Sequence, residues 1–147
     1  EVDGRGGKAL RMPAGGSRMP ASHETVDQQL HYVHQDGKAV FRFAVRNTVE
    51  ISQRVLRRNG LKPTDVDLFV CHQANRRIIE KAASELGVPL EKVVINIERF
   101  GNTTGATIPL ALSDGLADNR LKKGDLVLLA SVGAGFTVGS VLLRWAY

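Results

Sequence analysis

Two polar side chains lie where an apolar segment gives way to a helix-like one. His72 follows the apolar run at residues 66–71 and opens the sequence His-Gln-Ala-Asn. Asn102 comes shortly after a second apolar run, at residues 93–97. In α/β folds, such exits from strands line the ligand crevice. Because imidazole and carboxamide groups can both donate hydrogen bonds, His72 and Asn102 are candidate ligand-binding residues.

Each of these side chains also has a purely structural interpretation. A histidine at the end of a strand is often a hydrogen-bonded structural residue. Asn102 lies between a glycine and a threonine, where asparagine commonly forms a turn or an Asx cap. The pattern of residues alone leaves both alternatives open.

The elements that would position these residues alternate between strands and helices. Apolar spacing predicts a helix from residue 40 that stops at residues 59–60, and a second helix around 78–86 that ends at Gly87. A third helix is expected over 103–119, capped by Thr103 or Thr104, with Pro109 inside it leaving a carbonyl unpaired or kinking the first turns. The expected strands lie at residues 66–71, 93–97, 126–131 and 137–145, the last two forming a hairpin. Residues 1–39 are predicted to form a loop with one short strand near residues 30–33.

This order of elements predicts an α/β fold, with a mixed β-sheet packed with helices. A length of 147 residues suits one domain, residues 1–147. The longest apolar runs are far short of the ~20 residues that a membrane span needs. No signal peptide is recognisable. A single cysteine cannot form an internal disulfide, which fits a cytoplasmic protein.

The charge balance favours an acidic partner. The formal net charge is +5 and the isoelectric point about 9.7. Nucleic acid is not expected, because only 5% of the residues are aromatic and no nucleic-acid-binding motif is present. No metal is expected either, since the remaining histidines, His23, His31 and His34, lie in the irregular amino-terminal part.

Four motifs together give the chain a specific resemblance. They lie at residues 13–18, 72–75, 101–109 and 133–137. With them the whole chain resembles the carboxy-terminal half of β-ketoacyl-acyl carrier protein synthase III, a thiolase-fold condensing enzyme. The resemblance implies a thiolase-like half. It also implies that the nucleophilic cysteine belongs to an amino-terminal half absent from this sequence, so that the fragment alone is inactive.

The resemblance implies roles for three residues of the site. His72 and Asn102 would bind the thioester carbonyl of malonyl-acyl carrier protein and stabilise the enolate formed as carbon dioxide leaves, which requires hydrogen-bond donors. The backbone N–H of Ala134 would contribute to an oxyanion hole for the acyl-enzyme. The family's loop is more often all glycine, but a main-chain donor tolerates a methyl group where the local conformation accepts a Cβ.

Other positions match the family with competing interpretations. Asn75 matches a position near the pantetheine arm of coenzyme A, although capping of a helix start competes. Arg42 and Arg77 match basic positions that dock acyl carrier protein, although a solvated helix face is the ordinary alternative. Cys71 is rejected as a nucleophile, because residues 71 and 72 of an extended strand face opposite sides and free cysteine is commonly buried.

The implied activity is that of an acyltransferase that initiates fatty acid synthesis. An acyl group from acyl-coenzyme A would condense with malonyl-acyl carrier protein, without a resident cofactor, in an enzyme expected to be a homodimer when intact. The small residues Gly105, Ala106 and Ala111 would let the third helix pack closely against the amino-terminal half. Two alternatives stay open: a related acyltransferase of specialised metabolism, and a non-catalytic thiolase-like scaffold or subunit half.

Overall fold

The computed structural model describes all of residues 1–147, and the chain divides into two compact units. Unit 1 comprises Glu1–Phe43 and Gly133–Thr137, and unit 2 comprises Ala44–Val132 and Val138–Tyr147. The elements in chain order are η1 (Gly4–Lys8), β1 (Leu10–Arg11), α1 (His23–Asp27), β2 (His34–Gln35), α2 (Gly37–Arg58), η2 (Pro63–Asp65), β3 (Leu68–Cys71), α3 (Arg76–Leu86), η3 (Leu90–Lys92), α4 (Ile97–Phe100), η4 (Thr104–Ala106), α5 (Thr107–Ala117), β4 (Leu126–Gly133) and β5 (Thr137–Arg144).

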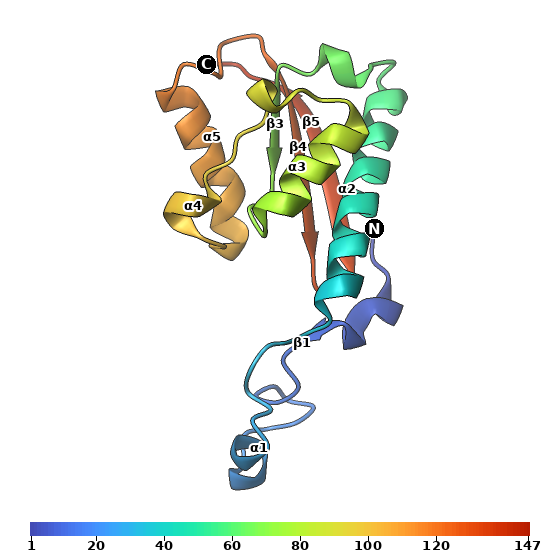
Figure 1. Ribbon diagram of the computed structural model, residues 1–147, viewed down its shortest axis with the longest axis vertical. Helices are drawn as coiled ribbons and strands as arrows, with labels where there is room; N and C mark the ends of the chain where they lie inside the picture. Colours follow the sequence, from blue (N-terminus) through green and yellow to red (C-terminus); the bar gives the residue numbers. More distant parts are fainter. The chain divides into compact units, whose positions relative to one another are not determined.

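The main sheet has the strand order β3-β4-β5. β3 runs parallel to β4, with Leu68 opposite Val127 and Cys71 opposite Ala130. Only residues 134–136 separate β4 from β5, a connection too short for a parallel crossover. β5 therefore runs opposite to β4, which confirms the predicted mixed sheet and closing hairpin (Figure 1).

Both faces of β3 are buried, and alternate residues belong to two different cores. Phe69 and Cys71 pack with residues of α2 and α3. Leu68 and Val70 pack on the other face, with Ala111 of α5. In Figure 1, α3 and α5 accordingly lie on opposite sides of β3. Each large apolar side chain buried in this way contributes roughly 1.5–3 kcal/mol, so both cores hold the strand that leads to His72 in place.

The first two predicted helices are confirmed, including where they end. α2 stops where the Asn59 side-chain amide donates to the Val55 carbonyl at 2.8 Å, and Gly60 follows with a φ of +68°. α3 ends at Gly87, whose φ is +81°. Glycine accepts these left-handed conformations at little cost, which is why these positions end helices.

The predicted strand at residues 93–97 is wrong. Only Val93 forms a bridge, to Phe69, and the chain then enters α4 at Ile97. The physical reason is the buried carboxamide of Gln73, which is 1% exposed. Its Nε2 donates to the carbonyls of Cys71 at 2.9 Å and Val94 at 3.1 Å, and its Oε1 accepts from the Asn96 N–H at 3.0 Å. The Val94 N–H still donates to the Phe69 carbonyl at 3.1 Å, but beyond it this one side chain takes the place of the backbone bonds that a strand would make.

The third helix begins later than predicted. The short 3-10 turn η4 precedes α5, which starts at Thr107, and neither Thr103 nor Thr104 provides a side-chain cap. Pro109 is therefore the third residue of α5. The first four N–H groups of a helix have no intrahelical partner, so the missing N–H of proline breaks no hydrogen bond there. We therefore no longer expect the unpaired carbonyl or the kink that a proline inside the helix would cause.

One of the three small residues expected to face the amino-terminal half makes a contact within the chain instead. Ala111 is buried against the sheet of the chain itself, at 0% exposure, whereas Gly105 and Ala106 are exposed. A Cβ placed on Gly115 would lie 3.2 Å from Leu68 Cδ2. The helix thus approaches β3 closely through Ala111 and Gly115, and Ala111 is not available for a partner half.

Unit 1 differs most from expectation. The predicted strand near residues 30–33 is wrong, since those residues form turns, while His34 and Gln35 of β2 pair antiparallel with Arg11 and Leu10 of β1. Helix α1 was not predicted. It is only five residues long and is started by a capping box between Ser22 and Thr25. None of the chain's helices combines the length and the apolar composition that a membrane crossing requires.

Candidate active site

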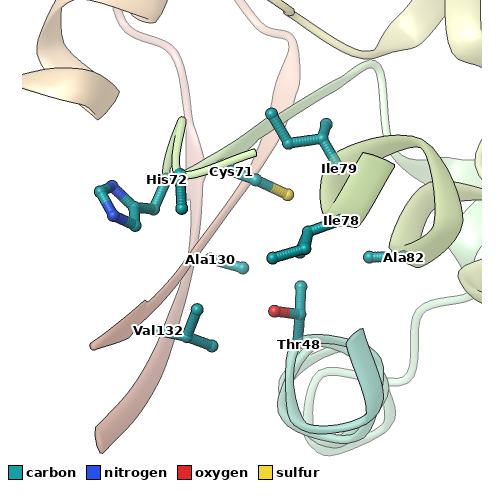
Figure 2. Close-up of a pocket in the computed structure, with 9 residues that line it drawn as sticks. Thr48, Cys71, His72, Ile78, Ile79, Ala82, Ala130 and Val132 are labelled. Carbon is teal, nitrogen blue, oxygen red and sulfur yellow. The ribbon is translucent and has the colours of Figure 1, made fainter. Parts of the chain in front are cut away.

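His72 is positioned by the end of β3. Its backbone N–H donates to the Ala130 carbonyl at 2.8 Å, so the pairing with β4 extends one residue beyond the strand. Figure 2 shows the consequence for the side chains: the imidazole of His72 points away from the sulfur of Cys71. The sulfur side forms a small pocket with Thr48, Ile78, Ile79 and Ala82 among its lining residues.

Cys71 lies in an environment unsuited to a nucleophile. Its side chain is buried and makes no disulfide. Burial raises the pKa of the Cys71 thiol far above its ordinary value, because the thiolate would lose its hydration. Since the thiolate is the reactive form, Cys71 acts here as a small apolar core residue.

The His72 ring is half-buried and held at one nitrogen. Its Nδ1 lies 2.7 Å from the Oγ1 of Thr107, the first residue of α5. Its Nε2 has no hydrogen-bonding partner within the chain. Burial lowers the pKa of His72, because the imidazolium loses hydration and no carboxylate compensates. A neutral ring is thus presented with its Nε2 edge available.

Asn102 is exposed, and its orientation is set by the backbone. Its Oδ1 accepts a hydrogen bond from the Thr104 N–H at 3.0 Å. A backbone N–H can only donate, so the oxygen must face it and the amide NH2 group points elsewhere. The Asx turn proposed as an alternative for Asn102 is therefore present, and it leaves both amide hydrogens free to bind a ligand. Thr104 holds this turn with a φ of +54°, which is unfavourable for a β-branched residue.

One hydrogen-bonded chain joins the two candidate residues. Thr107 Oγ1, which contacts His72, is also 3.0 Å from the Thr104 carbonyl oxygen. The N–H of the same Thr104 orients Asn102. The structure therefore brings His72 and Asn102 into a single cluster through the 104–107 turn. Sequence reasoning missed Thr107 and Gln73; both lie inside the motifs at residues 101–109 and 72–75, but no spacing or periodicity distinguishes them.

Ala134 lies in unit 1, in the connection between β4 and β5. The backbone φ of Ala134 is not positive, so its methyl group is compatible with the local conformation. Gly135 is the position that requires glycine. Its φ is +144°, and a Cβ there would come within 2.6 Å of Thr137 Oγ1.

The remaining candidates have structural contacts of their own. Asn75 caps α3, with its Oδ1 accepting from the Arg77 N–H at 2.9 Å. Arg42 and Arg77 are exposed on α2 and α3, in unit 1 and unit 2 respectively. Within residues 1–147, no group of three or more histidine, cysteine or acidic side chains is placed to hold a metal ion.

Comparison with known proteins places these features in a family. Residues 56–145 match the family described as 3-oxoacyl-[acyl-carrier-protein (ACP)] synthase III C terminal. The chain is 60% identical over all 147 residues to a β-ketoacyl-[acyl-carrier-protein] synthase III of Solibacter usitatus, covering 44% of that protein. The chain thus spans less than half the length of this relative.

Solved structures agree with this similarity. A 3-oxoacyl-(acyl carrier protein) synthase III of Pseudomonas aeruginosa superposes with a TM-score of 0.88 at 41% identity, over 100% of this chain and 43% of that one. The priming β-ketosynthase of the R1128 polyketide pathway gives 0.83 at 32% identity, over 99% and 43%. The predicted synthase III-like, thiolase-type α/β fold is confirmed.

Proposed function

Because the chain belongs to the 3-oxoacyl-[acyl-carrier-protein] synthase III C-terminal family, we propose that it is the carboxy-terminal part of a β-ketoacyl-acyl carrier protein synthase III. The intact enzyme would transfer an acyl group from acyl-coenzyme A to a cysteine of its amino-terminal half. It would then condense that group with malonyl-acyl carrier protein. The reaction is a decarboxylative Claisen condensation, which starts a fatty acid chain.

His72 and Asn102 act in the condensation half of this reaction. As carbon dioxide leaves the malonyl group, negative charge develops on the thioester oxygen. The amide NH2 of Asn102 and an N–H at His72 Nε2 would both donate to that oxygen. The observation that carries the proposal is the hydrogen-bonded cluster of residues 102–107, which orients both side chains while leaving their outer edges without partners.

Further contacts follow from the same proposal. The Ala134 N–H would help to stabilise the oxyanion of the acyl-enzyme. Asn75 would contact the pantetheine arm, and Arg42 and Arg77 would dock acyl carrier protein, in keeping with the net charge of +5. The reaction needs positioned donors and a thiolate but no resident cofactor or metal. The intact enzyme is proposed to be a homodimer of the cytoplasm.

A hybrid synthase tests this function. Residues 1–147 replace the stretch that they match in the Solibacter usitatus protein, and condensation of acetyl-coenzyme A with malonyl-acyl carrier protein is measured. We expect the hybrid to condense. His72→Ala and Asn102→Ala should each lower malonyl decarboxylation by about 10²–10³-fold, as loss of one oxyanion donor does, while acyl transfer from coenzyme A to the cysteine is retained.

Matched controls remove the same residue types elsewhere. His34 is exposed in β2, and Asn59 lies at the end of α2; His34→Ala and Asn59→Ala should leave decarboxylation close to that of the unaltered hybrid. A hybrid that folds but does not condense would support the scaffold alternative. Equal loss of decarboxylation and acyl transfer in His72→Ala would show that His72 maintains structure instead.

The similarity to a polyketide priming ketosynthase supports one second candidate, a condensing enzyme of specialised metabolism. It differs in the acyl group that it accepts. A panel of acyl-coenzyme A substrates offered to the full-length protein carrying this chain separates the two. Preference for a short starter such as acetyl favours fatty acid synthesis, and preference for another acyl group favours the second candidate.

A further inference from the structure

Helix α4, which leads to Asn102, has no buried side chain to hold it in place. It ends at Phe100, just before the turn that contains Asn102, and none of its residues is buried. Phe100 itself is 41% exposed. A helix of one turn is not stable by itself, because the cost of fixing the first turn is recovered only over many more residues. Contacts with polar groups are therefore needed to fix the path of the chain toward Asn102.

These contacts converge on the carboxylate of Asp114, in α5. Its Oδ2 accepts a hydrogen bond from Asn96 Nδ2 at 2.5 Å and another from the guanidinium of Arg99. Asn96 is the residue immediately before α4 and is 4% exposed, whereas Arg99 lies near the end of α4. Asp114 thus binds α4 at its start and near its end.

The two contacts of Asp114 differ in strength. The side chain of Arg99 is 60% exposed, and exposed ion pairs contribute little. The side chain of Asp114 is only 17% exposed, and its partner Asn96 is buried. The hydrogen bond from Asn96, assisted by the Arg99 charge, lowers the pKa of Asp114, so the carboxylate stays ionised at neutral pH. The contact with Asn96 is therefore the main link.

The helix that carries Asp114 is a firm support. The next residue, Gly115, packs so closely on β3 that a Cβ there would lie 3.2 Å from Leu68 Cδ2. Thr107, two turns before Asp114 in α5, contacts the His72 ring. Residues two turns apart lie on the same face of a helix. One face of α5 therefore contacts His72 at its first residue and holds α4 farther along.

We propose that Asp114 is a positioning residue for Asn102: its carboxylate anchors α4 to α5 and so fixes the place from which the Asn102 amide donates. The catalytic consequence rests on the proposed function, but the anchoring does not. Asp114 acts through Asn96 and the helix that follows it.

Backbone hydrogen exchange in the hybrid synthase tests the anchoring without depending on activity. The Thr104 N–H donates to Asn102 Oδ1, so its protection reports whether Asn102 occupies its turn. In Asp114→Ala, exchange at Thr104 should become faster, while the amides of β3 and α3 exchange as in the unaltered hybrid. Malonyl decarboxylation should fall about tenfold, as expected for the loss of a hydrogen bond to a charged group, and acyl transfer to the cysteine should be retained.

Related variants identify the contact that matters. Asp114→Asn keeps the shape and one accepting oxygen, and it should lie between Asp114→Ala and the unaltered hybrid in both measurements. Arg99→Ala should have a smaller effect than Asp114→Ala. Asn96→Ala and Asp114→Ala remove the same hydrogen bond, so the double variant should lose less than the sum of the two single losses. Asp118→Ala is the matched control: it removes an exposed acidic side chain at the end of α5 and should change neither measurement.

Unchanged exchange at Thr104 in Asp114→Ala would overturn the proposal. If that variant does not fold, unchanged exchange in Asp114→Asn has the same meaning. Faster exchange throughout β3 and α3, with equal loss of decarboxylation and acyl transfer, would also overturn it, because Asp114 would then support the fold in general. If the unaltered hybrid does not condense, the proposed function fails, and exchange at Thr104 still decides whether Asp114 positions Asn102.

Discussion

At the scale of single residues, each of the two candidate side chains has one neighbour that fixes its orientation. A carboxamide has an oxygen end and a nitrogen end of almost the same shape. The Thr104 N–H settles which end of Asn102 faces inward. A neutral imidazole poses the same problem with its two nitrogens, and Thr107 contacts only one of them. In both cases the inner contact determines what the outer edge can do.

The protonation of His72 gives a prediction at this scale. Its pKa is lowered by burial, whereas a histidine in the unfolded chain titrates near 6.5. Between these two pKa values the unfolded state binds the proton more readily. The free energy of unfolding should therefore fall as the pH drops below about 6.5, and stop falling once the pH is below the folded pKa.

NMR titration of the hybrid synthase, labelled with 15N-histidine, gives the pKa of His72 in the folded protein directly. Denaturant unfolding at several pH values gives the free energy of unfolding. His72→Gln should lose less stability than the unaltered protein over that range, because it has no ring to protonate there. His34→Gln, which removes an exposed histidine, serves as the control. Parallel loss in His72→Gln and the unaltered hybrid would contradict the prediction.

At the scale of elements, the sequence predicts best where a local rule and the core agree. α2 and α3 have apolar positions at helical spacing and end at glycines, and both appear as expected. Residues 93–97 have the composition of a strand, but the Gln73 side chain is the partner of the Val94 carbonyl and of the Asn96 N–H. No apolar pattern reveals that a side chain far along the chain will take over hydrogen bonds.

The candidate site shows the same limit. His72 and Asn102 could be named as candidates because their motifs resemble a known family. The contact of Thr107 with His72 could not be foreseen, because it depends on a turn in which Thr104 takes a left-handed conformation that its residue type disfavours. The start of α5 was misplaced for the same reason. Hydrogen bonds of Thr104 with Asn102 and Thr107, the latter in contact with His72, stabilise that turn against the local preference.

Asn75 provides a prediction at this scale, since one side chain has two suggested tasks. Asn75→Ala removes the cap of α3 and should lower the free energy of unfolding by about 1 kcal/mol. Asn75→Ser keeps a capping hydroxyl and should be nearly as stable as the unaltered hybrid. If Asn75 also contacts the pantetheine arm, KM for acyl-coenzyme A should rise in both variants.

Denaturant unfolding and steady-state kinetics on the same two proteins separate the tasks. A rise in KM confined to the alanine variant would mean that only the helix start matters. The pantetheine contact would then be withdrawn, and Asn75 would remain as a structural cap.

At the scale of the whole molecule, the net charge of +5 would attract an acidic partner such as the proposed acyl carrier protein. Arg77→Glu in the hybrid should weaken the reaction with malonyl-acyl carrier protein, mainly through KM. The advantage of the unaltered protein should shrink as salt rises, because salt screens charges at the surface. Malonyl-coenzyme A, used in place of the carrier protein, should be affected less. Arg42→Glu should behave in the same way.

Lys123→Glu is the matched control, since it makes the same change of charge at an exposed lysine after α5. It should alter neither substrate's KM by a comparable factor. An Arg77→Glu protein that loses both reactions equally, at every salt concentration, would show that Arg77 supports the site's structure and does not dock the carrier protein.

The carboxamide of Gln73 has a consequence for how natural or laboratory variants of this family are interpreted. It connects the end of β3, which carries His72, to the segment that leads to Asn102. It uses both of its amide hydrogens and its oxygen to do so, and neither a carboxylate nor an apolar side chain can supply that set. In a mutational scan, position 73 would therefore be as intolerant as a catalytic position, although its buried side chain meets no reactant. Intolerance to substitution is thus not by itself a sign of contact with substrate in this fold.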